Sequence, residues 1–387
     1  MQQQTVQLLC ALLKSAVSGK ELSEEEKRVY SDFGGNELWS LAEKNELSHL
    51  VSWAITQNKL SVAEEIDLQR PWLKAVFQNE RMLLDYQSVC QALEKARIPF
   101  LPLKGSVLRG YYPESWMRTS CDVDILVHRE HLEAAIACLV QDLQFVEKGR
   151  GSHDVSLFSP MDVHVELHFD LIEEERVNNA FFILEEVWQH AAPRPGSDYF
   201  YRMTDAFFYL YHLVHMAKHI ETGGCGVRPF LDLWILDRLE TADLAGRDAL
   251  LERCGLSTFT RVCRQLSRAW FEAEPMEEAS RQLQEYLLRG GVYGTSANRV
   301  ALAQKKKGGR LGYLWSRMFI SYDKLKRYYP ILEKHRWLMP FMQIRRWFML
   351  LDPGVAKMAK SEMAANSRLQ ADRAGEMEEL LKNIGLS

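Results

Sequence analysis

The sequence lacks the features that mark a membrane-spanning, secreted or disulfide-stapled chain. It contains no uncharged apolar run of about 18 residues, so we expect no transmembrane helix. Residues 1–21 include an apolar stretch but no basic leader, and Lys14 interrupts them, which predicts an amphipathic helix and not a secretion signal. Seven cysteines stand singly without Cys-x-x-Cys spacing. This pattern argues against a disulfide framework or a zinc site and favours a reducing compartment, the cytoplasm.

The 387 residues suffice for two or three domains. Apolar residues recur at three- and four-residue spacing before and after a central stretch of period-2 alternation. We therefore predict an α+β fold, in which a small mixed β-sheet core is flanked by N-terminal and C-terminal helical domains. The predicted parts are an N-terminal helical region (1–95), a catalytic core (96–195), a helical domain that completes the cleft (196–295), a basic aromatic-rich helical segment (296–350) and a peripheral C-terminal helix or tail (351–387).

Two aspartates stand out in the segment CDVDILV. Asp122 and Asp124 lie two residues apart in an apolar run, so in a strand both side chains point to one face. Two carboxylates at roughly 4 Å repel each other by on the order of 4 kcal/mol at an effective dielectric constant near 20. A divalent cation between them removes this cost, and Mg²⁺ prefers carboxylate oxygens and usually binds together with substrate phosphates.

Two segments flank this pair. Upstream, an apolar run leads into Lys104, Gly105 and Ser106. We expect a tight turn at Gly105 and a helix directly after it, whose N-terminus, with Lys104 and the Ser106 hydroxyl, binds an anion. Downstream, MDVHVELHFD alternates as a strand that places Glu166 on one face with His164 and His168. If this strand pairs with the aspartate strand, Glu166 becomes a third carboxylate of a two-metal centre.

Together, LKGSVLRGYYP, Arg118, CDVDILV and VELH resemble the nucleotidyltransferase superfamily of the DNA polymerase β type. They are most similar to an uncharacterised nucleotidyltransferase family with the pattern LKG…YP…R…D-h-D-h-LV…h-E-L-H, in which h is apolar. The resemblance implies that Asp122 and Asp124 bind two Mg²⁺ ions, with Mn²⁺ as an alternative. It also implies that Glu166 binds the catalytic metal and helps to deprotonate the acceptor. A lysine before the Gly-Ser turn departs from the superfamily's common pattern.

The resemblance extends beyond the sheet to a histidine…Arg…Asp-Leu pattern. It implies that His215, His219, Arg228 and Asp232 contact the nucleotide or the acceptor, and that Arg118 reaches a phosphate. The plainer alternatives are an exposed loop arginine at Arg118 and a buried ion pair between Arg228 and Asp232, one helical turn apart. His212, His215 and His219 share one helical face, which suits a metal site or, with aromatic neighbours, a core or cleft lining.

The formal net charge of −4 conceals a basic segment. Residues 299–346 contain thirteen Lys and Arg against two acidic residues, with aromatic residues interleaved. Such a segment suits a nucleic-acid groove, a membrane surface or a solvated helix face. We predict an anionic contact for it.

The predicted function is Mg²⁺-dependent transfer of a nucleoside monophosphate from an NTP such as ATP to a hydroxyl or phosphate acceptor, with release of pyrophosphate. A sugar phosphate, antibiotic, lipid-linked glycan, peptide or RNA all remain open as acceptor. One alternative is a toxin-like nucleotidyltransferase that modifies RNA. The other is a non-catalytic adaptor that binds nucleotide or sits on a membrane.

Overall fold

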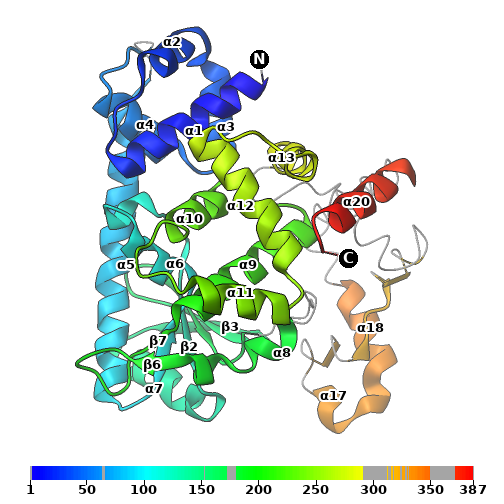
Figure 1. The fold of residues 1–387 in the computed structure, drawn as a ribbon. Helices are drawn as coiled ribbons and strands as arrows, with labels where there is room; N and C mark the ends of the chain where they lie inside the picture. The colour runs from blue at the N-terminus through cyan, green and yellow to red at the C-terminus, as the bar shows by residue number, and fades with distance from the viewer. Residues whose placement is uncertain are drawn as a thin grey trace.

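The computed structural model describes residues 2–62, 66–151, 153–171, 180–290, 331–348 and 371–386, with scattered residues between 312 and 329. The N-terminal region is helical, as predicted. Its helices are α1 (Gln2–Ser18), α2 (Glu24–Phe33), α3 (Asn36–Lys44), α4 (Ser48–Gln57) and α5 (Gln69–Lys95). Ser23 and Glu26 begin α2 with a reciprocal capping box, in which each side chain accepts a hydrogen bond from the other residue's backbone N–H. The long α5 packs against α4 at one end and runs along one edge of the molecule (Figure 1).

A mixed sheet follows, which confirms the predicted α+β fold. Among the described residues it has five strands, in the spatial order β1 (Phe100–Pro102), β2 (Asp122–Val127), β5 (His164–His168), β4 (Asp154–Phe158) and β3 (Val146–Arg150). β2 and β5 are parallel, whereas the other neighbouring strands are antiparallel. The expected pairing of the aspartate strand with the glutamate strand is therefore present.

Short helical segments and one longer helix connect these strands. They are α6 (Lys104–Leu108), η1 (Arg109–Tyr111), η2 (Ser115–Met117), η3 (Arg129–His131) and α7 (Leu132–Leu143).

The sheet has one apolar face and one polar face. Val123, Ile125 and Val127 of β2 are buried in a cluster with apolar residues of α5 and α7. Because side chains alternate along a strand, Asp122 and Asp124 point to the opposite face. Burial of an aliphatic side chain contributes about 1.5–3 kcal/mol, so the apolar face holds β2 in a single orientation. A slip of one residue would bury both carboxylates against α5 and α7.

The chain then returns to helix. The elements are α8 (Ala180–Leu184), η4 (Val187–His190), the strand pair β6 (Ala191–Pro193) and β7 (Tyr201–Met203), α9 (Asp205–Thr222), α10 (Arg228–Leu236), α11 (Leu244–Arg253), α12 (Ser257–Glu272) and α13 (Glu278–Gly290). The Thr204 side chain caps the start of α9, and Gly223, with a φ of 140°, ends it. One apolar core joins α1–α4 to α9, α10 and α12, so these two helical regions pack together.

The last described elements are α17 (Ile331–Lys334), η5 (Arg336–Leu338), α18 (Met339–Trp347) and α20 (Ala371–Asn383). Residues 299–311 of the predicted basic segment and residues 351–370 of the predicted tail lie outside the described residues. Figure 1 shows α17 and α18 well away from the sheet, on the side opposite α5. Within the described residues, every helix falls short of the length or apolar character needed to cross a bilayer.

Candidate active site

The parallel pairing of β2 with β5 gathers the predicted carboxylates. Asp124 lies directly opposite Glu166, and Asp122 lies opposite His164. His168 is two residues beyond Glu166 on the same face. Asp124 and His168 are buried, whereas Asp122, His164 and Glu166 are half-buried at the surface of the site. Residues more than 40 positions apart in the sequence thus form one compact polar group.

These side chains offer two overlapping sets of metal ligands. Asp122, His164 and Glu166 form one set, and Asp124, Glu166 and His168 form the other; in each, the ligand atoms lie within 4.8 Å of one another. Glu166 belongs to both sets. Carboxylate oxygens are the ligands that Mg²⁺ and Mn²⁺ favour, and three of them converge here. The donor chemistry of this group therefore fits a divalent cation.

The electrostatics of the group point the same way. Burial, and then the charge of Asp124, raise the pKa of Asp122 to about 6. For Asp124 itself, burial opposes ionisation, but the Lys104 ammonium and the hydrogen bond from His168 outweigh it and lower the pKa. The hydrogen bond from His168 also lowers the pKa of Glu166. All three carboxylates therefore carry charge at mildly alkaline pH.

His168 ties two of these carboxylates together. Its Nε2 lies 2.8 Å from Asp124 Oδ1 and 3.3 Å from Glu166 Oε2. Burial opposes the protonated ring, but the hydrogen bonds to Asp124 and Glu166 outweigh it and raise the pKa of His168. His168 thus holds both carboxylates in place.

The turn before α6 differs from the expectation. The helix begins at Lys104, one residue before Gly105, and the positive φ of 42° belongs to Lys104. Gly105 is needed for a different reason: a Cβ there would lie 3.0 Å from the Cβ of Ser120, just before β2. The Lys104 Nζ lies 3.0 Å from Asp124 Oδ1. The lysine that departs from the superfamily's pattern is therefore part of the carboxylate group.

Ser106 has an unusual environment. Its Oγ is fully buried and has no hydrogen-bond partner among the described residues. A buried hydroxyl without a partner costs about 1–3 kcal/mol, and such groups are rare unless a ligand, ion or water completes them. Ser106 lies two residues after Lys104, so this hydroxyl is a candidate ligand contact at the edge of the site.

Helix α9 supplies side chains near the carboxylates. His219 Nε2 lies 3.0 Å from His215 Nε2. Burial is the main cause that lowers the pKa of His215, and the positive charge of Lys104 is the second. Burial also lowers the pKa of His219, to about 4, and the charges of Lys218 and Lys104 add to this shift. His212, on the same helical face in the sequence, instead contacts the carbonyl oxygen of Pro229.

Sequence reasoning missed two residues of this helix, Tyr211 and Lys218. Tyr211 is buried, and this burial raises its pKa. The positive charge of Lys104 opposes the shift, and the negative charge of Asp124 adds to it. Burial, and then repulsion from Lys104, lower the pKa of Lys218 to about 8, while Glu166 opposes this shift. Their spacing from His215 places them on the same side of α9, and this spacing was the available signal.

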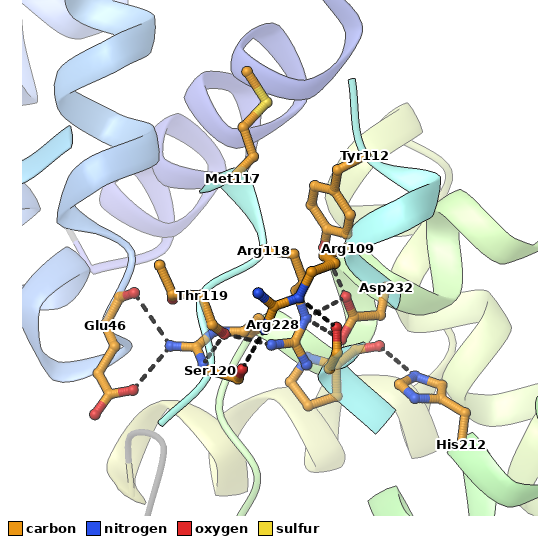
Figure 2. Close-up of polar contacts among 12 residues, drawn as sticks. Glu46, Arg109, Tyr112, Met117, Arg118, Thr119, Ser120, His212, Arg228 and Asp232 are labelled. Carbon is orange, nitrogen blue, oxygen red and sulfur yellow. Dashed lines mark hydrogen bonds and ion pairs between the residues drawn. The ribbon is translucent and has the colours of Figure 1, made fainter. Parts of the chain in front are cut away.

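The predicted arginines and Asp232 lie together in one network of polar contacts (Figure 2). Arg118 Nε lies 2.7 Å from Asp232 Oδ1, and the Tyr112 hydroxyl donates to the same oxygen at 2.7 Å. Arg228 instead contacts Glu46 Oε2 at 2.9 Å and the carbonyl oxygen of Thr119. The Arg118 side chain is thus only 11% exposed and is not an exposed loop arginine, and Asp232 pairs with Arg118 and not with Arg228.

Arg109 completes this network. Its guanidinium donates to Gly105 O, to Asn79 Oδ1 and to Ser120 Oγ, and the Ser120 hydroxyl in turn donates to the carbonyl oxygen of Asp122. The network therefore joins the Gly105 turn to the start of β2, and it fixes the loop that delivers Asp122.

Comparison with known proteins agrees with this geometry. Residues 31–272, well over half of the chain, match a protein family described as uncharacterised nucleotidyltransferase. The match spans every residue of the carboxylate group, the Gly105 turn and the arginine network. No curated protein and no solved structure matches the chain. The chain belongs to the uncharacterised nucleotidyltransferase family.

Proposed function

We propose that this protein transfers a nucleoside monophosphate from an NTP to a hydroxyl or phosphate acceptor. The observation that carries the proposal is the convergence of Asp122, Asp124 and Glu166 on one face of the sheet, beside Lys104. An acceptor oxygen attacks the α-phosphorus, a new P–O bond forms, and the bond between the α-phosphorus and the oxygen that bridges the α- and β-phosphates breaks. Pyrophosphate leaves with that electron pair, and the proton of the acceptor passes to a carboxylate oxygen or to water.

Asp122, Asp124 and Glu166 are the residues that would hold Mg²⁺, or Mn²⁺, as one or two ions. A divalent cation bound there supplies charge neutralisation for the phosphates and lowers the pKa of an acceptor hydroxyl. The protein's own contribution is to keep the three carboxylates ionised and oriented. His168 does this by bridging Asp124 and Glu166, and Arg109 does it by tying the loop before Asp122 to Gly105.

Lys104, Gly105 and Ser106 are the proposed phosphate contacts. The ammonium of Lys104 supplies positive charge, the Ser106 hydroxyl is an unpaired donor, and Gly105 allows the two segments to approach closely. Positioning and charge neutralisation are the main contributions to phosphoryl-transfer catalysis. Nucleotide contact by Arg118, His219, Arg228 and Asp232 stays a prediction. For Arg118 and Asp232 we propose that they chiefly position the loop, because each already pairs with the other.

The test uses α-labelled NTPs, Mg²⁺ and a cell extract, and it follows both label transfer and pyrophosphate release. We expect Asp122→Asn and Asp124→Asn each to abolish both signals, with circular dichroism unchanged. Asp162→Asn is the matched control, because this exposed turn residue makes the same chemical change outside the carboxylate group. Unchanged pyrophosphate release from Asp124→Asn would contradict the proposal. Binding of NTP that is independent of Mg²⁺, measured by calorimetry without any transfer, would favour the non-catalytic adaptor.

A further inference from the structure

The helical run that ends in α18 carries an apolar stripe that faces solvent. Trp337, Phe341, Ile344 and Phe348 are 69%, 60%, 48% and 65% exposed. Their spacing of four, three and four residues places them on one face of the run from η5 through α18. We call these four residues the α18 stripe. Soluble proteins rarely leave such contiguous apolar surface open unless it meets a partner.

The other side of α18 is already packed. Gln343 Nε2 donates to the carbonyl oxygen of Ile320, and Trp347 Nε1 and Arg346 both donate to that of Met318. The Phe319 ring also packs edge-on against Trp347, with centroids 5.5 Å apart. The helix is thus anchored through one side, and the α18 stripe is the side that these contacts leave open.

Exposed apolar residues concentrate in this part of the chain. Of the 17 large apolar side chains that are exposed among the described residues, eight lie between positions 315 and 348. Trp315 and Met318 are both more than half exposed, and Met318 belongs to the segment that anchors α18.

Cationic side chains flank the stripe. Residues 331–348 contain four Lys and Arg against one glutamate. Lys334, Arg336 and Arg345 are exposed, and Arg336 and Arg345 lie over the rings of Tyr322 and Tyr329. Apolar and aromatic residues on one side of a helix, with basic residues at its borders, are typical of helices that lie in the interface of an anionic bilayer.

We propose that the α18 stripe docks on an anionic lipid surface, with Lys334, Arg336 and Arg345 contacting the headgroups. The basic residues favour an anionic lipid surface over a neutral membrane or a protein surface with few acidic residues. The reason is that each basic residue near an anionic lipid surface adds to binding. The side-chain types select it over single-stranded RNA. Nucleic-acid grooves use rings on which bases stack, whereas Ile344 at the centre of the stripe provides aliphatic surface that suits acyl chains.

The test is co-sedimentation of the full chain with vesicles of phosphatidylcholine alone and of phosphatidylcholine mixed with phosphatidylserine. We expect binding to the mixed vesicles that weakens as salt rises. The double variant Trp337→Ser/Phe341→Ser should lower the apparent affinity by about tenfold or more, because the inserted apolar area is lost. Arg336→Gln/Arg345→Gln should weaken binding to the mixed vesicles alone.

The matched control removes two exposed apolar side chains from another helix. Phe77 and Leu84 of α5 are 64% and 56% exposed, so Phe77→Ser/Leu84→Ser makes an equivalent change far from α18. We expect this variant to bind vesicles as the wild type does. Equal loss in both double variants, or wild-type binding by the stripe variant, would overturn the proposal. RNA binding or self-association that is lost in the stripe variant, without any vesicle binding, would assign this face to another partner and would overturn it as well.

Discussion

The charge of Asp122 destabilises the metal-free protein, and the loss of unfolding free energy can be measured. Burial, and then the nearby charge of Asp124, raise its pKa from 3.8 to about 6 in the folded state. The ionised carboxylate therefore destabilises the fold wherever no cation offsets it. We predict that Asp122→Asn, which keeps the shape of the side chain and removes the charge, stabilises the metal-free protein at pH 8 while abolishing nucleotide transfer.

The magnitude follows from the two pKa values. A difference between 3.8 and about 6 corresponds to about 3 kcal/mol at neutral pH. Asp122 is half-buried, so solvent screening reduces the expected gain to about 2 kcal/mol. The folded pKa of this acid exceeds its unfolded value, so the penalty is full above about pH 6 and shrinks as pH falls. It vanishes below about pH 3.8, where Asp122 is protonated in both states.

Urea unfolding in EDTA measures this difference at pH 8 and at about pH 4, with Asp162→Asn as the exposed control. The gain in unfolding free energy should appear at pH 8 for Asp122→Asn only, and it should nearly disappear at the lower pH. Adding Mg²⁺ or Mn²⁺ at pH 8 should stabilise the wild type but not Asp122→Asn, because a ligand stabilises only the state that binds it. A metal-free Asp122→Asn protein that is less stable than the wild type at pH 8 would refute the reasoning.

Three further predictions concern the surroundings of the site. Asp232→Asn should cost about 3–5 kcal/mol in urea unfolding, because it leaves the largely buried Arg118 charge without its carboxylate partner; a loss below 1 kcal/mol would contradict the pairing. Gly105→Ala should cost about 1–3 kcal/mol and lower pyrophosphate release, because its Cβ meets Ser120 at 3.0 Å, whereas Gly110→Ala, with open space around it, should change neither. Burial lowers the pKa of His49 to about 4, below its unfolded value near 6.5, so the folded state should lose up to about 3 kcal/mol as pH falls from 6.5 to 4. His49→Gln should flatten that part of the stability profile, and an unchanged profile would exclude His49 as its source.

Local pattern was enough to predict the two strands that carry the carboxylates. Period-2 alternation in CDVDILV and in VHVELH predicts two strands, each with its carboxylates on one face, and the structure contains β2 and β5 at these positions. This works because side-chain direction in a strand depends only on the residue's own position along it. The mixed sheet between helical regions follows from the same periodicities.

The sequence by itself thus determined that these two segments form strands between helical regions, and which face of each strand is charged. Only the tertiary structure decided that Asp124 stands opposite Glu166, that Lys104 and His168 both contact Asp124, and that Asp232 pairs with Arg118, 114 residues away. The reason is physical. A contact between distant segments depends on how whole faces of the sheet and helices pack, and many pairings of charged residues satisfy the local pattern equally well until that packing selects one.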